Sequence, residues 1–267
     1  MNRLTTAIDA ALAAGDVLRR KLNGARAITS KGPRDLVTDA DLAAQRVILE
    51  RVRARYPDEA ILSEEGQHDV DLSAPGPLWI IDPLDGTNNY ARRFPFFAVS
   101  IGLAAGGEAQ MGVVYDPLRR ELFYAERGQG AFLRTGRGRP RRLAVSAVGQ
   151  AASAFLVGGW PRQDVRRAEA ARLIPRLGAV CHTLRMTGSL ALNLAYLAAG
   201  RVDGGFSLAH QPWDVAAGAA LVREAGGQLS ELEGGGGRLT AARLLYSNGR
   251  LHAELRQLLT DDPPAGG

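Results

Sequence analysis

The sequence predicts an α+β protein built from two successive halves, residues 1–145 and 146–260, with a disordered tail at 261–267. Three observations predict it. Apolar residues recur at helical spacing near the N-terminus, and short strand-like segments separated by turns follow them. In the second half, strand-like and helix-like segments alternate, which is typical of a mostly parallel or mixed sheet covered by helices.

The first half contains two amphipathic helices followed by an antiparallel meander. Apolar spacing predicts helices over 3–22 and 39–55, and Pro57 follows the second. The segment DPLRR is a turn between two strands. Strands are predicted at the segments AILSEEG, a short strand that leaves into a loop, LWIID, FAVSIGLAA, MGVVYD, ELFYAE and GAFL.

The second half is predicted as alternating strands and helices. The run EGGGGR at 233–238 is predicted as a loop, because successive glycines cannot build a packed element. Strands are predicted at SAFLVGG, AVCHTLRM and VDGGFSL, and helices at RQDVRRAEAARLIPRL, GSLALNLAYLAAG and PWDVAAGAALVREAGG.

The composition is typical of a soluble globular protein, with 46% hydrophobic and 23% charged residues. No apolar run reaches the roughly 18 residues that a membrane span needs. Asp9 and Asp16 interrupt the apolar pattern of the N-terminal segment, which a signal peptide would keep uninterrupted. A cytoplasmic protein without membrane contact is therefore expected. Cys181 is the only cysteine, so no internal disulfide forms, and it is interpreted as a small buried apolar residue.

The chain is basic, with a net charge of +5 and a pI of about 9.8. Arginine is spread along the chain, with one dense cluster, RTGRGRPRR, at 134–142. This cluster is either a solvated loop or a phosphate-attracting patch, and we interpret it as a solvated loop. A nucleic-acid partner is not expected, but a diffuse positive field would attract small anions.

The segment WIIDPLDGTNNY at 79–90 leads an apolar strand into Asp82 and Asp85. Two carboxylates about 4 Å apart repel by roughly 4 kcal/mol at an effective dielectric near 20, so the pair indicates a shared proton or a bound cation. Gly86 permits a tight turn, and Thr87 opens a short helix whose free N–H groups would face an anion. An Asp-rich turn with a helix cap is the structural alternative.

Two further acidic positions are individually weak signals. Glu64 and Glu65 follow a strand, where adjacent acids are usually solvated, and Asp214 is either a helix N-cap or a ligand held by the helix. Together with the paired aspartates, in this order along the chain, they form a combination that is far more specific than any one of them. The histidines fall in no motif and are interpreted as non-ligands: His68, His182, His210 and His252.

Three segments in this order, LSEEG, WIIDPLDGT and PWDVAAGAALVREAGG, resemble the signature motifs of the inositol monophosphatase family. DLVTDAD at 35–41 resembles the family's N-terminal motif, and RRFPFFAVSIGL, GVVYDP and GQGAF extend the resemblance over about residues 5–258. The resemblance implies a layered αβαβα sandwich, the fold of this family and of related sugar phosphatases. It also implies a magnesium-dependent, lithium-sensitive phosphatase that forms a homodimer.

Residue by residue, the resemblance implies the following roles. Two or three Mg²⁺ ions, for which Mn²⁺ can substitute, would be held by Glu64, Asp82, the Leu84 carbonyl, Asp85 and Asp214. The amides of Gly86 and Thr87 would bind phosphate, and Asp41 with Thr87 would orient the attacking water. Glu65 and Lys31 would help to arrange the catalytic site.

The substrate is predicted to be a small-molecule phosphate ester, with inositol-1-phosphate first. Gly188 and Ser189 in MTGSLALNLA would lie beside the hydroxyls of the leaving alcohol, and Ser207 stands where animal members carry a glutamate. Histidinol phosphate and 3'-phosphoadenosine 5'-phosphate are the next candidates. A non-enzymatic alternative is an RNA- or transcription-associated protein that retains the fold.

Overall fold

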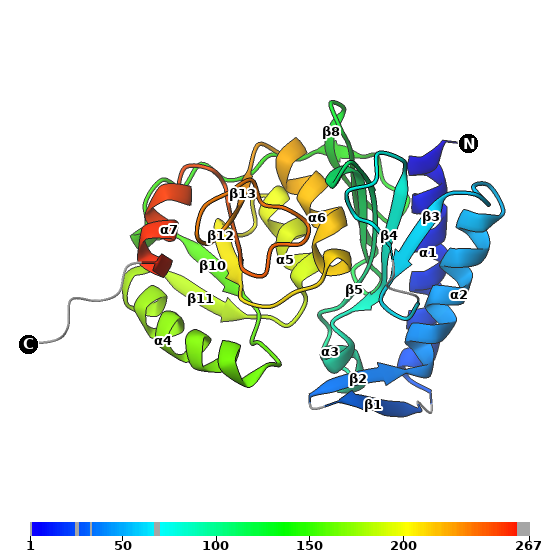
Figure 1. Cartoon of the computed structure of the whole chain (residues 1–267), viewed down its shortest axis with the longest axis horizontal. Coiled ribbons are helices and arrows are strands. Elements are labelled where there is room, and N and C mark those ends of the chain that lie inside the picture. The colour runs from blue at the N-terminus through cyan, green and yellow to red at the C-terminus, as the bar shows by residue number, and fades with distance from the viewer. Residues whose placement is uncertain (1, 25–26, 33, 67–69, 261–267) are drawn as a thin grey trace, which may run out of the picture.

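The computed structural model describes residues 2–24, 27–32, 34–66 and 70–260. Within these residues, helices and sheets alternate in layers across the molecule (Figure 1). The order is a helix pair, a seven-stranded sheet, a second helix pair, a five-stranded sheet and an outer helix pair. The predicted α+β class and the layered αβαβα sandwich are therefore confirmed.

The first layer consists of α1 (Arg3–Leu22) and α2 (Asp39–Arg53), close to the two helices predicted at this end of the chain. The Asn2 side chain caps α1, and Thr38 and Asp41 form a capping box at the start of α2. The apolar faces of both helices bury Trp79 of the adjacent sheet completely. This packing fixes the start of α2, and with it Asp41, against the sheet.

The seven-stranded sheet has the order β3-β4-β5-β6-β7-β8-β9. Its first pair is parallel and the remaining pairs are antiparallel, so the predicted meander is confirmed. The short β9 lies inside the arginine-rich segment that was predicted as a loop. The strands are β3 (Ala60–Ser63), β4 (Leu78–Asp85), β5 (Ala98–Ala105), β6 (Glu108–Asp116), β7 (Glu121–Glu126), β8 (Gly130–Thr135) and β9 (Arg141–Arg142).

Helices α5 (Leu190–Ala198) and α6 (Pro212–Glu224) lie between the two sheets (Figure 1). Helix α6 approaches strands β5 and β6 closely because Gly102 and Gly112 have no side chains. A Cβ atom added at Gly112 would lie only 2.1 Å from the carbonyl oxygen of Ala217, and Gly102 is similarly crowded. This approach brings the first turn of α6 beside the end of β4.

The five-stranded sheet is mixed, with the order β11-β10-β12-β14-β13. Its first three strands are parallel and the others antiparallel, as expected for the second half. Helices α4 (Asp164–Val180) and α7 (His252–Thr260) cover its outer face (Figure 1). The strands are β10 (Phe155–Gly158), β11 (Thr183–Met186), β12 (Gly204–Ser207), β13 (Gln228–Glu231) and β14 (Leu244–Ser247).

Three features differ from the sequence-based predictions. Helix α4 continues to Val180, so the strand predicted at AVCHTLRM is shorter. Strands β13 and β14 and helix α7 were not predicted. A hairpin of β1 (Ile28–Gly32) and β2 (Asp35–Thr38) was also missed, because its segment lacks a clear apolar alternation.

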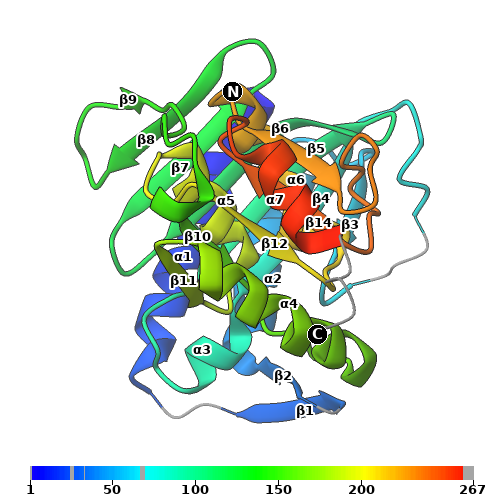
Figure 2. The same ribbon diagram turned by 90° about the vertical axis from the view of Figure 1, so that its left-hand side faces the viewer.

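The hairpin β1–β2 lies at the same end of the molecule as the short helix α3 (Thr87–Ala91) and the start of α4 (Figure 2). Among the described residues, none of the helices has the length and apolar character of a membrane span. Cys181 is half-buried against the outer core. The predicted tail at 261–267 lies outside the described residues, and the division near residue 145 stays a prediction.

Candidate metal centre

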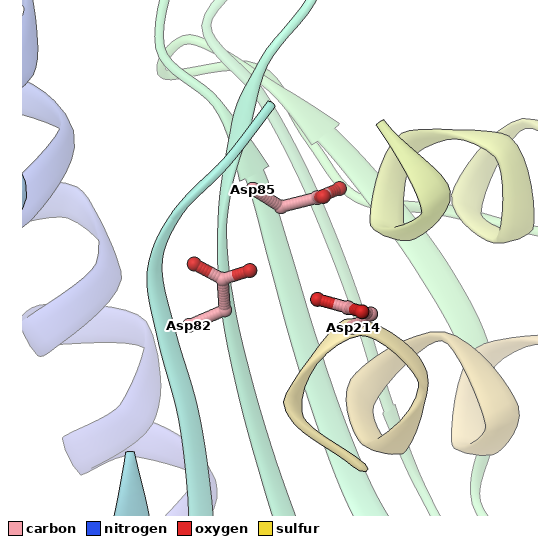
Figure 3. Close-up of side chains that lie close together, drawn as sticks. All are labelled: Asp82, Asp85 and Asp214. Carbon is pink, nitrogen blue, oxygen red and sulfur yellow. The ribbon is translucent and has the colours of Figure 1, made fainter. Parts of the chain in front are cut away.

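Three carboxylates converge where β4 ends and α6 begins (Figure 3). Asp82, Asp85 and Asp214 each place one carboxylate oxygen within 4.8 Å of the corresponding oxygens of the other two. Asp82 and Asp85 are almost completely buried, and Asp214 is half-buried. Asp214 follows Asp82 by 132 positions and Asp85 by 129 positions in the sequence. The three residues nevertheless form one compact acidic cluster, which we call the aspartate cluster.

Strand β4 positions the first two aspartates through an irregularity in its pairing with β5. The register shifts between Asp82, which faces Ser100, and Asp85, which faces Ala98. The backbone N–H of Leu84 donates to Asp82 Oδ1 at 2.9 Å. The one extra residue of β4 between the two pairings bends the strand, so both carboxylates can lie at the same cluster.

Helix α6 positions Asp214 in its first turn. Pro212 stands at the first position of the helix, where its missing N–H costs no hydrogen bond. The side chain of Asp214 forms one half of a capping box, because the backbone N–H of Gln211 donates to its Oδ2 at 2.8 Å. Asp214 therefore combines the two roles that the sequence left open as alternatives: it caps the helix and it lies in the aspartate cluster.

Burial and mutual repulsion make the ionised cluster unfavourable by itself. Burial raises the pKa of Asp82 well above its usual range, and the charges of Glu64, Asp85 and Asp214 raise it further. Burial raises the pKa of Asp85 to about 6, although the hydrogen bond from Ser189 opposes the increase. Burial, followed by the charge of Asp85, raises the pKa of Asp214 to about 8. A bound cation would offset these charges.

Asp41 and Thr87 are in contact with each other, and Thr87 also contacts the end of β4. The Thr87 hydroxyl lies 3.1 Å from Asp41 Oδ1 and 3.0 Å from the carbonyl oxygen of Leu84, so its single hydrogen is shared between two acceptors. The backbone N–H and hydroxyl of Thr38 hold the other oxygen of Asp41 at 2.9 and 2.5 Å. Burial raises the pKa of Asp41, whereas the hydrogen bonds from Thr38 and Thr87 lower it.

The two glutamates of the SEEG segment follow β3, next to the end of β4. The N–H of Glu64 donates to the carbonyl of Ile81 at 3.1 Å, and Glu64 is close enough to raise the pKa of Asp82. Gln45 of α2 holds the backbone of Glu65, accepting from its N–H at 3.2 Å and donating to its carbonyl at 2.9 Å. The side chain of Lys31 lies outside what the structure describes.

A cavity of about 900 Å³ opens beside the cluster. Its volume lies within the roughly 300–1,000 Å³ typical of small-molecule sites. The predicted site residues on its wall are Glu64, Asp85, Gly86, Gly188, Ser189, Ser207 and Asp214. Sequence reasoning missed other wall residues: Arg34, Trp160, Arg162 and Gln163. His210, interpreted as a non-ligand, also lies on this wall.

The predicted substrate-binding serines already have partners within the protein. Ser189 caps helix α5, and its hydroxyl donates to Asp85 Oδ2 at 2.5 Å. The hydroxyl of Ser207 donates to the carbonyl of Ala209 at 3.2 Å. Gly188, between Thr187 and Ser189, has a φ of 81°, where a residue with a side chain would be strained. The binding of substrate by these residues stays a prediction.

The aspartate cluster fits a hard divalent cation. Its donors are carboxylate oxygens, and this set suits Mg²⁺ or Mn²⁺. Hydrogen bonds to Asp82 Oδ1, Asp85 Oδ2 and Asp214 Oδ2 orient the three groups and fix their positions. Within the described residues, His210 is the one histidine on the cavity wall, and it is not part of the cluster.

The layered fold and the aspartate cluster together define a class of proteins with a candidate metal centre between the seven-stranded sheet and helix α6. The family model of the inositol monophosphatase family matches residues 1–262. This chain belongs to that family.

Its relatives carry two kinds of name. Nus factor SuhB of Salmonella typhimurium (strain LT2) is 41% identical over 269 residues, with 97% of each chain covered. The solved structure of extragenic suppressor protein suhB from Bartonella henselae has a TM-score of 0.90 at 34% identity, covering 97% of this chain and 98% of the other. The inositol monophosphatase from Anabaena has a TM-score of 0.83 at 37% identity, covering 98% and 96%.

Proposed function

We propose that this chain is a metal-dependent phosphomonoesterase that hydrolyses a small phosphate ester, with inositol-1-phosphate as the first candidate. The observation that carries this proposal is the convergence of Asp82, Asp85 and Asp214 beside a cavity of about 900 Å³. Membership of the inositol monophosphatase family and the name of the Anabaena relative support the same ester class. Histidinol phosphate and adenosine 3',5'-bisphosphate are the next candidates.

Asp82, Asp85 and Asp214 would hold the cations, with Glu64 and the Leu84 carbonyl as further oxygen donors. Divalent cations supply the positive charge that acidifies water and stabilises the leaving oxygen of an ester. The protein's contribution is to fix the donor oxygens before the cations arrive, through the hydrogen bonds at 2.9, 2.5 and 2.8 Å that orient the three aspartates.

The remaining site residues position the reactants. Asp41 and Thr87 orient the attacking water. The Thr87 hydroxyl donates to Oδ1 of Asp41 and so holds this acceptor oxygen in place. The amides of Gly86 and Thr87 hold the phosphate at the start of α3, while Glu65 is fixed by Gln45 beside the cluster. The alcohol part of the ester occupies the cavity between Gly188 and Ser207.

A substrate panel tests this function. Inositol-1-phosphate, histidinol phosphate, fructose-1,6-bisphosphate and adenosine 3',5'-bisphosphate are compared at equal concentration, with Mg²⁺, with Mn²⁺ and with EDTA. We expect release of inorganic phosphate from at least one ester, lost in EDTA and restored by Mg²⁺. Absence of phosphate release from every ester with either cation would contradict the proposal.

A second candidate function is association with RNA or with the transcription machinery. The observation that favours it is the name Nus factor, carried by a relative 41% identical over nearly the whole chain. Electrophoretic mobility shift of labelled RNA at increasing salt tests it, alongside the hydrolysis assays. Homodimerisation, lithium inhibition and the cellular compartment stay predictions from the resemblance.

A further inference from the structure

Trp160 is a large apolar side chain on the wall of the cavity, and the sequence analysis did not single it out. It lies in the segment 159–163 between β10 and α4, and it is 45% exposed. Trp79, by contrast, is completely buried. An exposed indole on a cavity wall offers apolar surface that a bound ligand can cover.

The indole of Trp160 is held in place from behind. The guanidinium carbon of Arg167 lies 5.0 Å from the ring centroid, and its Nη1 donates to the carbonyl of Pro161 at 3.3 Å. This cation–π contact covers part of the ring and limits its rotation. A ring fixed before binding loses little conformational entropy when a ligand packs on it.

The segment is also tethered to the β1–β2 hairpin, which contributes Arg34 to the same cavity wall. Arg34 of the β1–β2 hairpin donates to the carbonyl of Arg162 at 2.8 Å and to Asp164 Oδ1 at 2.7 Å. Arg162 of this segment lines the same cavity as Asp85 and Asp214. Trp160 therefore lies on the wall of the same cavity as Asp85 and Asp214 of the cluster.

From these contacts we infer that Trp160 is a specificity-determining residue that packs against the apolar face of a ring in the leaving alcohol. The preferred substrates are then phosphate esters of cyclic alcohols, whether a cyclic polyol, a sugar or a nucleoside. The inference rests on the proposed phosphatase function and adds to it a preference for substrates whose alcohol contains a ring. Ring C–H groups and nucleobase π-faces both pack on an indole, whereas an acyclic alcohol covers little of it.

The kinetic test compares two ring esters, inositol-1-phosphate and adenosine 2'-monophosphate, with the acyclic ester glycerol 2-phosphate. For Trp160→Ala, we expect the ratio of ring to acyclic kcat/KM to fall about tenfold, mainly through KM. Trp160→Phe keeps an aromatic face and should retain most of the ratio. Val165→Ala is the matched control, since Val165 is 73% exposed on the adjacent turn of α4 but does not line the cavity. The two ring esters distinguish a polyol from a nucleoside as the better ligand.

An unchanged ratio in Trp160→Ala, with active wild-type protein, would overturn the inference and leave the phosphatase proposal intact. If the wild type cleaves none of the esters, the phosphatase proposal fails, and binding decides the role of Trp160. Quenching of intrinsic fluorescence by the two ring esters is then compared between wild type and Trp160→Phe. Ester-dependent quenching that disappears in the variant supports the role of Trp160, and equal quenching in both proteins contradicts it.

Discussion

The hydroxyl of Ser189 donates a hydrogen bond of 2.5 Å to Oδ2 of Asp85 and joins the start of α5 to the end of β4. The backbone N–H of Ala191 donates to the same oxygen at 2.7 Å. Both side chains are buried, and the two residues are 104 positions apart. The orientation of one carboxylate in the aspartate cluster is thus fixed by a helix N-cap from the second half of the chain.

Ser189→Ala should weaken the binding of divalent cations about tenfold, because a group that orients a metal ligand typically contributes 10–100-fold in affinity. Titration with Mn²⁺ by calorimetry measures the change. Ser73→Ala is a matched control, because the Ser73 hydroxyl makes a similar bond of 2.6 Å to Asp71 in an exposed loop. Equal Mn²⁺ affinity in wild type and Ser189→Ala would show that the bond to Asp85 does not prepare the cluster.

Asp85→Asn should reduce turnover at least a hundredfold while the metal-free protein keeps its stability. Burial raises the pKa of Asp85 to about 6, so Asp85 is mostly ionised at neutral pH but its ionisation costs folding free energy relative to the unfolded chain. Replacing this charge by a neutral amide removes a repulsion and a metal ligand together. Thermal unfolding with and without Mg²⁺ measures both effects. A large drop in the Tm of the metal-free variant would contradict this account.

Gly112→Ala should destabilise the fold by about 1–3 kcal/mol and also lower phosphatase activity. The new Cβ would lie 2.1 Å from the carbonyl oxygen of Ala217, so α6 must shift and carry Asp214 with it. Gly76→Ala is the control, because a Cβ at Gly76 meets no atom within 4 Å. Urea unfolding and phosphate release measure the two consequences. A variant as stable and active as the wild type would show that this close contact is not needed.

His252 should make the fold sensitive to acid. Burial lowers its pKa from 6.5 to about 4, and its two ring nitrogens lie 2.9 and 2.8 Å from the hydroxyls of Ser247 and Ser230. The folded state then binds fewer protons than the unfolded state between these values. Stability is complete above pH 6.5 and declines as the pH falls through 4, by about 3 kcal/mol for this group.

Urea unfolding between pH 7.5 and pH 4 measures this loss. His252→Gln should show a shallower decline than the wild type, because its side chain cannot take up the proton. His182→Gln removes an exposed histidine and should follow the wild-type curve. Parallel curves for wild type and His252→Gln would contradict the assigned role.

Much of the fold follows from local patterns. Helices α1, α2 and α6 and the strands of the meander have apolar spacings that predict them within a few residues. The hairpin β1–β2 could not be predicted, because its strands are short and no apolar alternation marks them. The strand expected at AVCHTLRM begins only at Thr183, because the helical pattern of α4 continues past Pro175.

The site was only partly predictable, for a physical reason. Asp82 and Asp85 are close in sequence, so their repulsion indicates a cation. Asp214 joins them only after α6 packs on the sheet at Gly102 and Gly112, and the family resemblance, not spacing, identified it. The positions of Trp160 and Arg162 on the cavity wall depend on tertiary packing of an irregular segment, which no local pattern encodes.

The most direct test of the metal centre is a crystal structure of the protein soaked in Mn²⁺, with anomalous diffraction measured. We expect at least one anomalous peak within about 2.5 Å of oxygens from Asp82, Asp85 and Asp214, and no such peak in crystals of Asp214→Asn. An anomalous map without a peak at the three aspartates under saturating Mn²⁺, in crystals where their side chains are ordered, would contradict the account.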